Sequence, residues 1–181
     1  MSYLERETVK RVRGALLDAG LTDTVIELKE TARTAEDAAA SVDCELGAIV
    51  KSLVFAIDRR LVMALVAGDH QCNQDNLPKA LFLEGEVRRP DAGEVKGATG
   101  FTIGGVAPIG MLHPLPMVID RSLKRFETLY AAAGHPHCVF PVAFDDLARM
   151  TGGTVSWGIA SPIDPGVSSG PVFKRSKTFS K

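Results

Sequence analysis

The chain has 181 residues, of which 45% are hydrophobic and 24% are charged, and these values suit one globular domain with a continuous core. The formal net charge of -1 excludes a strongly basic protein, so any polyanionic partner must bind a local basic patch. The three cysteines form no CxxC pair, which argues against a disulfide framework and a thiolate zinc site. No stretch approaches the roughly 20 apolar residues of a membrane span, and no apolar leader is evident, so we expect a soluble cytoplasmic protein.

The first part of the chain predicts two helices and a buried hairpin. Apolar residues from Leu4 to Leu17 recur at helical spacing, and Gly20 is placed to end that helix. Thr34 and Asp37 have the spacing of a capping box before the run AEDAAASV. The apolar runs KSLVFAI and LVMALVA are separated by a turn-like Asp-Arg-Arg, which is typical of a buried hairpin.

The second part predicts short helices, a long loop and further strands. Helices are expected at 76–82 and 91–98, on either side of the strand EVRR. The stretch GATGFTIGGVAPIGMLHPLP holds five glycines and three prolines, so it should be a structured loop. The segments MVID, TLYAA and CVF are strand-like, and FDDLARMTGG is a helix that glycine ends.

Together these elements predict an α/β fold in which a mixed β-sheet, curled and barrel-like, is flanked by short helices. We expect a single domain over residues 1–160. Residues 161–181 are rich in serine, proline and glycine and end in lysine and arginine, which predicts a flexible basic tail.

Three positions could carry chemistry in this frame. Lys51 heads an apolar strand, where it is either an edge residue whose amine reaches solvent or a charge held for a ligand. Gly104 and Gly105 could let a ligand approach the main chain and aim amide groups at an oxyanion, or they could form a packed turn. Asp120 ends the strand MVID, where it could cap the next helical turn, pair with a cation or serve as a polar site residue.

Sequence patterns for a protein nucleophile or a metal site are absent. No serine lies in GxSxG, no cysteine has an evident histidine partner, and HExxH does not occur. His135 and His137 lie in the expected turn GHPH, where exposed histidines are common. We therefore expect neither a metal nor another cofactor.

The order of these segments resembles the YbaK/EbsC family of aminoacyl-tRNA deacylases, which is related to the editing domain inserted in bacterial prolyl-tRNA synthetases. The segments that carry the resemblance are TAEDAAASVDCELGAIVKSLVF, ATGFTIGGVAPIG, PLPMVID and AAGHPHCVFPVAFDDLARMTGG. The resemblance implies a trans-editing hydrolase that deacylates mischarged aminoacyl-tRNA without a metal. A positioned water, assisted by the adjacent ribose hydroxyl, would then attack the ester, and one or two side chains would set the choice of amino acid.

The resemblance also implies roles for particular residues. Lys51 is similar to the family lysine that holds the 3′-terminal nucleotide near its phosphate, and Gly104 and Gly105 to the loop that holds the aminoacyl carbonyl. Met111 stands where relatives often have histidine or another polar residue, a departure for which the nearby His113 could substitute. The residues expected to bind the substrate are Thr34, Thr102, Pro108, Gly110 and Asp120.

The implied partner is the acceptor end of mischarged tRNA, with an aminoacyl-tRNA synthetase as a second candidate. The basic segments that could contact tRNA, each of which could equally be a solvated surface, are 59–60, 88–89, 124–125 and 174–181. Two other functions stay open: a non-catalytic module that binds tRNA or a synthetase, and a hydrolase of a small non-tRNA ester. Release of amino acid from mischarged tRNA would exclude the first, and comparison with minimal esters would test the second.

Overall fold

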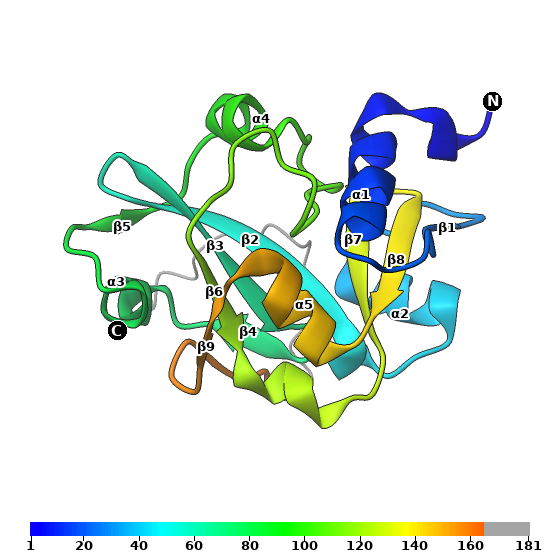
Figure 1. The fold of residues 1–181 in the computed structure, drawn as a ribbon. Helices are drawn as coiled ribbons and strands as arrows, with labels where there is room; N and C mark the ends of the chain where they lie inside the picture. The colour runs from blue at the N-terminus through cyan, green and yellow to red at the C-terminus, as the bar shows by residue number, and fades with distance from the viewer. Residues whose placement is uncertain (165–181) are drawn as a thin grey trace.

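The computed structural model describes residues 1–164, in which a curled β-sheet carries helices on its faces (Figure 1). The main sheet has eight strands, in the order β1-β8-β7-β2-β3-β6-β9 with β5 added beside β2. Its strands are β1 (Ile26–Glu27), β2 (Ile49–Ile57), β3 (Arg60–Ala67), β5 (Val87–Arg88), β6 (Met117–Asp120), β7 (Leu129–His135), β8 (Cys138–Val142) and β9 (Thr154–Ser156). A second sheet pairs β4 (His70–Cys72) with β10 (Ala160–Pro162).

The helices are short. The α-helices are α1 (Glu7–Asp18), α2 (Ala35–Val42), α3 (Leu77–Leu81), α4 (Ala92–Thr99) and α5 (Phe144–Thr151). The 3₁₀ helices are η1 (Tyr3–Glu5), η2 (Leu46–Ala48), η3 (Gln74–Asn76) and η4 (Arg121–Arg125).

The main sheet is mixed, as the sequence predicts. β2 pairs with β3 and β7 with β8 in antiparallel fashion, whereas β2 with β7, β3 with β6 and β6 with β9 are parallel. The α/β class and the flanking short helices are therefore confirmed. The sheet does not close, because β1 and β9 are its two edges, so the curl stops short of a barrel.

The β2–β3 hairpin is the centre of the fold. All nine residues of β2 are buried, because apolar side chains cover both faces of the sheet here. On one face Val50 and Val54 join the larger core, which includes residues of α1, α5 and the long loop. On the other face Leu53 and Phe55 join a smaller core with Leu77 of α3.

The main chain of β2 is paired along nearly all of one side but only at the two ends of the other side. β3 pairs with it from Val50 to Ile57 on the first side. On the other side β7 pairs only at Ile49 and Val50, and β5 pairs only at Ala56 and Ile57. Residues 51–55 therefore have no partner strand there within the described part of the chain, and the sheet is interrupted.

Most of the predicted elements are confirmed with small changes in their bounds. Thr34 caps α2, Asp91 and Glu94 form a full capping box at α4, and the hairpin turns at Asp58, whose φ is 52°. The glycine- and proline-rich loop contains no regular element from residue 100 to 116. Strands β4, β9 and β10 were not among the predicted elements, because three residues of strand have too little pattern to recognise.

Pairing continues past the predicted domain boundary at residue 160. Strand β10 takes in Ser161 and Pro162, which pair with Gln71 and His70 of β4. The predicted basic tail beyond residue 164 lies outside the described residues. Within residues 1–164, no helix combines the length and the apolar character needed to cross a membrane.

Contact between α1 and β7 depends on Gly134. Its φ is +89°, and a Cβ at this position would lie 2.6 Å from the carbonyl oxygen of Thr8. We expect Gly134→Ala to lower the free energy of unfolding by about 2–4 kcal/mol, because it adds both backbone strain and a clash with main chain. Urea titration followed by circular dichroism measures the change.

Gly14 provides the matched control within α1. A Cβ there would meet no atom of a neighbouring element within 4 Å. Gly14→Ala should therefore raise the free energy of unfolding by about 0.5–1 kcal/mol, since alanine is the better helix former. Equal effects of the two substitutions would contradict the close packing of α1 on β7.

Candidate functional site

A small pocket lies where β2 and β7 part. Its cavity volume is about 40 Å³, and its walls come from the start of α2, the first half of β2, the long loop, β7 and the turn into β8. A water-sized sphere takes about 10–15 Å³ on this measure, so the pocket holds roughly three such spheres. Most of its side chains are alanine, valine and isoleucine, and Thr34, Ser52 and His135 are among the polar ones.

Thr34 places the first turn of α2 against this pocket. Its Oγ1 accepts a hydrogen bond of 3.0 Å from the N–H of Asp37, which satisfies one of the free amide groups of the helix start. The predicted cap is therefore confirmed, and the same residue lines the pocket. A direct contact of Thr34 with substrate stays a prediction.

The paired glycines form a tight turn beside the pocket. The N–H of Gly105 donates to the carbonyl of Thr102 at 3.0 Å, and Gly104, with a φ of +97°, is the third residue of the turn. A Cβ on Gly105 would lie 2.9 Å from the main-chain N of His135, so the turn packs directly against the end of β7. Gly104 lines the pocket, whereas Thr102 is exposed and does not.

The second half of the glycine-rich loop faces another place. Pro108, Gly110 and Met111 line a wider hollow of about 360 Å³ with residues of α1 and α5. The structure therefore does not bring Pro108 and Gly110 together with Gly104 in one pocket. Met111, the departure from the family pattern, also lies outside the small pocket.

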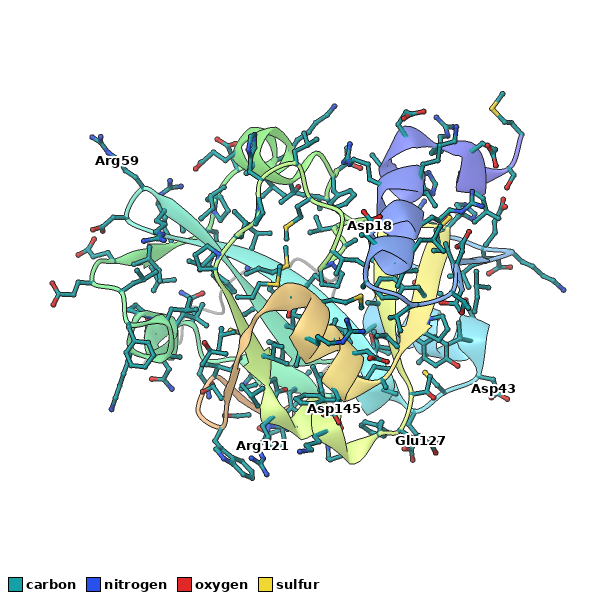
Figure 2. All side chains as sticks on the ribbon, viewed as in Figure 1. Asp18, Asp43, Arg59, Arg121, Glu127 and Asp145 are labelled. Carbon is teal, nitrogen blue, oxygen red and sulfur yellow. The ribbon has the colours of Figure 1, made fainter. Side chains whose placement is uncertain are left out.

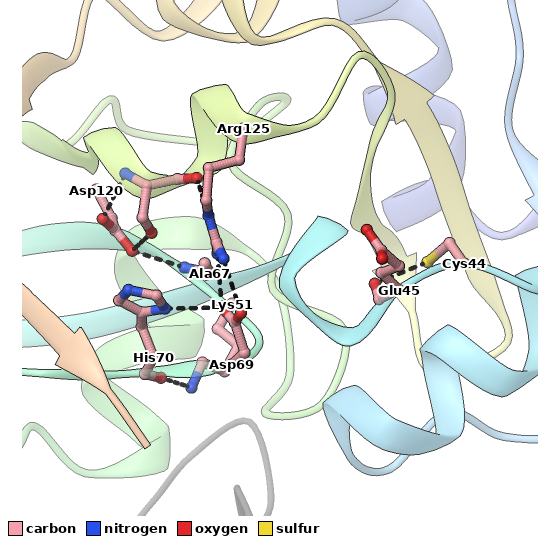
Figure 3. A network of polar contacts seen from close by, with 9 residues as sticks. Cys44, Glu45, Lys51, Ala67, Asp69, His70, Asp120 and Arg125 are labelled. Atoms are coloured by element: carbon pink, nitrogen blue, oxygen red, sulfur yellow. Dashed lines mark hydrogen bonds and ion pairs between the residues drawn. The ribbon is translucent and has the colours of Figure 1, made fainter. Parts of the chain in front are cut away.

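Lys51 lies on the opposite face of β2 from Ser52. Successive side chains of a strand point to opposite faces, so Ser52 shares a face with Val50 and Val54, and Lys51 shares one with Leu53. Lys51 is only 5% exposed, and its Nζ donates to the carbonyl of His70 (Figure 3). This burial excludes the interpretation of Lys51 as an edge residue that reaches solvent.

Next to Lys51, a chain of ionic contacts links β4 to η4. Both Nη atoms of Arg125 donate to the carboxylate of Asp69, at 2.8 and 2.9 Å, and Nδ1 of His70 lies 2.7 Å from the same carboxylate (Figure 3). Burial raises the pKa of Asp69, but the hydrogen bonds from Arg125 and His70 outweigh it and the pKa is lowered. Asp69 therefore carries a negative charge that compensates the cations around it.

Asp120 uses both of its carboxylate oxygens inside the protein. Oδ1 accepts from the N–H of Ser122 at 2.9 Å, and Oδ2 accepts from the hydroxyl of Ser122 at 2.7 Å and from the N–H of Ala67 at 3.1 Å. The residue is 4% exposed and caps η4. Of the three interpretations left open by the sequence, the geometry shows the cap. A contact of Asp120 with substrate stays a prediction.

A stack of three rings borders the small pocket. Tyr3 of η1 stacks on His135 and His137, with ring centroids 4.2 and 4.4 Å apart. Nδ1 of His135 accepts the main-chain N–H of His137 at 3.0 Å, so the neutral ring carries its proton on Nε2. Burial, then the neighbouring His137 and Arg6, lower the pKa of His135, which favours this neutral form.

Both histidines lie at the β7–β8 turn, as predicted, but they are half-buried rather than exposed. Nε2 of His137 lies 2.9 Å from the hydroxyl of Thr31, and its Nδ1 lies 3.2 Å from the carbonyl of Leu28. Nothing in the sequence connects Tyr3 with residues more than a hundred positions away, so the stack could not be predicted from spacing.

Several of the predicted basic residues are already paired. Arg88 forms a salt bridge of 2.8 Å with Glu94, and the guanidinium of Arg89 lies over the ring of Phe55. Arg59 is exposed at the tip of the hairpin, far from Arg121 (Figure 2).

Trp157 is an exposed aromatic residue that the sequence patterns did not single out. The guanidinium carbon of Arg121 lies 3.9 Å from the ring centroid of Trp157, which is 77% exposed. Arg121 belongs to η4, the element that also carries Arg125. The signal was present in the sequence as the chain's one tryptophan, in the segment TVSWG.

An open mixed sheet that parts around a small, mostly apolar pocket defines an α/β domain with a candidate site at the interruption of its sheet. Comparison with known proteins places the chain more narrowly. Residues 29–150 match the family described as "Aminoacyl-tRNA editing domain", and the chain belongs to that family. The predicted family relationship is thereby confirmed.

Three relatives give the context of this family. The uncharacterized protein YwhH of Bacillus subtilis (strain 168) is 30% identical over 145 residues, covering 80% of this chain and 91% of that protein. A proline–tRNA ligase of Solidesulfovibrio magneticus is 28% identical over 160 residues, which cover 82% of this chain but only 28% of the ligase. A solved structure of a candidate trans-editing enzyme for prolyl tRNA synthetase superposes with a TM-score of 0.79 and 34% identity, covering 86% and 98% of the two chains.

The hydrogen bonds of Asp120 generate a prediction about stability. Asp120→Ala leaves the buried N–H of Ala67 without its acceptor, so we expect a loss of about 2–4 kcal/mol in the free energy of unfolding. Glu127→Ala removes an exposed carboxylate from the same region and should change stability by less than about 0.5 kcal/mol. Urea titration of both variants checks this, and an Asp120→Ala protein as stable as the control would refute the capping role.

Proposed function

We propose that the chain is a trans-editing hydrolase that releases the amino acid from mischarged aminoacyl-tRNA. The observation that carries this proposal is the small pocket at the interruption of the sheet, in a chain that belongs to the aminoacyl-tRNA editing domain family. The pocket has room for a small aminoacyl side chain, and the ester would lie at its mouth. The names of the relatives point to proline tRNA as the first substrate to test.

The chemistry asks little of the protein beyond positioning. An aminoacyl ester is already activated, so a bound water can attack its carbonyl carbon and the ribose oxygen leaves with a proton. Main-chain groups of residues 51–55 have no partner strand on the pocket side, which makes them available to hold polar groups of the ligand. His135 also lines the pocket, and its neutral ring would offer an Nε2–H as a further donor.

Lys51 is the proposed anchor for the 3′-terminal nucleotide. It is the neighbour of Val50 and Ser52, both of which line the pocket, but its ammonium lies on the other face of the strand. If the aminoacyl group enters the pocket through the interruption of the sheet beside β2, the nucleotide attached to it would lie close to both faces of that strand. A fixed ammonium at that point would attract the phosphate.

Deacylation assays on a panel of mischarged tRNAs test the proposal directly. We expect the protein to release a small amino acid from tRNA for proline. The release is measured as the loss of acid-precipitable radiolabel. Tight binding of mischarged tRNA without release would favour the non-catalytic module. Equal rates with tRNA-linked and minimal esters would favour a general esterase.

Lys51→Met removes the ammonium and keeps the length of the side chain. We expect kcat/KM for mischarged tRNA to fall about 10- to 100-fold, because a charge-assisted hydrogen bond is lost. The slope of log affinity against log salt should also become shallower by about 0.7, the value for one single-strand phosphate.

The same change at Lys96, which is exposed on α4, is the control and should leave kcat/KM unchanged. Unfolding of the Lys51 variant is measured in parallel, since the ammonium also donates to His70. An unaltered kcat/KM and salt slope in Lys51→Met would remove Lys51 from the site.

Trp157 and Arg121 are proposed to contact the tRNA beyond its terminal nucleotide. Exposed aromatic rings next to guanidinium groups are typical platforms for bases, and each stack contributes about 1–3 kcal/mol. Trp157→Ala should therefore lower kcat/KM for aminoacyl-tRNA about tenfold or more and leave hydrolysis of a minimal aminoacyl-adenosine ester unchanged.

Leu17→Ala is the control for this experiment, because it shortens another exposed apolar side chain on a distant element, α1. A Trp157→Ala enzyme that keeps full activity on tRNA, or loses activity on both kinds of ester, would show that this surface does not bind tRNA.

A further inference from the structure

Ser52 carries a buried hydroxyl that is unsatisfied. It is 2% exposed, and its Oγ has no hydrogen-bond partner within residues 1–164. Buried polar groups in native proteins are nearly always paired, because an unpaired one loses its bonds to water without replacement. Because Ser52 lines the candidate pocket, a ligand bound there could supply that partner.

The surroundings of Ser52 argue against a packing role for its hydroxyl. On its face of β2 the neighbouring side chains are Val50 and Val54, both in the larger core. A strand buried on both faces favours an apolar residue at such a position. Alanine would satisfy the packing without an unpaired hydroxyl, so the oxygen atom itself needs an explanation.

The pocket in front of Ser52 limits what can bind. Its volume of about 40 Å³ accommodates two or three heavy atoms, which fits the side chains of alanine, serine and cysteine and excludes leucine or phenylalanine. A ligand side chain that enters this space displaces any water from it, so the polar atom of the ligand becomes the partner of Ser52. A hydroxyl that belongs to the ligand needs only the one partner that Ser52 supplies.

We propose that Ser52 is a specificity-determining residue whose Oγ forms a hydrogen bond with a polar atom on Cβ of the aminoacyl group. The preferred substrate is then a small polar aminoacyl ester, with seryl preferred over alanyl. This inference rests on the proposed function and deepens it by naming the substrate class. Alanyl esters fit the same space but leave the Ser52 hydroxyl unpaired.

The test compares seryl and alanyl esters of one tRNA for proline with the wild-type enzyme and Ser52→Ala. Wild type should have a kcat/KM about tenfold or more higher for the seryl ester, because a site built around a hydroxyl discriminates against a ligand that lacks it. Ser52→Ala should lower kcat/KM for the seryl ester by about the same factor. The alanyl ester should change by less than about twofold.

Ser52→Thr is the matched variant that keeps a hydroxyl and adds a methyl group. The extra methyl shrinks the pocket, so both esters should react more slowly while the preference for seryl is retained. Stability should not fall in Ser52→Ala, because the Oγ makes no hydrogen bond in the free protein. Urea titration of each variant verifies this.

Two outcomes of the kinetic comparison would overturn the inference. An equal loss for both esters in Ser52→Ala would mean that the hydroxyl holds the attacking water, and no change for either would mean that it does not meet the substrate. Binding of stable amide-linked seryl- and alanyl-adenosine, measured by calorimetry, separates this inference from the proposed function. If the wild-type protein releases no amino acid but binds the seryl analogue more tightly, and Ser52→Ala abolishes that preference, only the catalytic proposal is refuted. If the wild-type protein binds the two analogues equally, the role of Ser52 is refuted.

Discussion

Complete burial of β2 is the constraint on which the rest of the structure depends. A strand covered on both faces needs two cores, and α1 with α5 supplies one and α3 supplies the other. It also needs partners for its main chain, and β3 provides these along one side only. On the other side, two short pairings leave a stretch of main chain without a strand, and the small pocket forms at the start of that stretch. The candidate site is thus a consequence of how the central strand is covered.

Local chemistry made much of the fold predictable from the sequence. Caps at Thr34 and Asp91 depend on residues three positions apart, and the β2–β3 hairpin depends on two adjacent apolar runs. The parallel pairing of β2 with β7 joins segments about eighty residues apart, and no local pattern encodes such a pairing. The curled mixed sheet was predicted correctly, and its short edge strands β1 and β9 leave it open.

The candidate site was predictable only in part for the same reason. Thr34 and Gly104 were recognised from the family pattern, and the structure brings both into one pocket. The family pattern gives positions along the chain but does not say on which face of the sheet a side chain lies. It therefore grouped Lys51 with the glycine loop, although the side chain of Lys51 points to the other face of β2. Strand alternation within KSLVF would have placed Ser52, a polar residue in an apolar run, on the face opposite Lys51. Tyr3 and its histidine stack have no comparable signal.

Charge around the site is balanced before any ligand binds. Arg125 is held by Asp69, and Lys51 lies beside the same group of contacts, with the carboxylate of Asp120 bound to main chain and Ser122 nearby. With a net charge of -1 for the whole chain, long-range attraction to the polyanionic tRNA is weak. Under the proposed function, discrimination would therefore come from short-range interactions, namely the shape of a pocket of about 40 Å³, hydrogen bonds made inside it and stacking on exposed rings. Such interactions would act on the aminoacyl group and the terminal bases far more than on the body of the tRNA, so the proposed enzyme would distinguish substrates by their amino acid rather than by their tRNA.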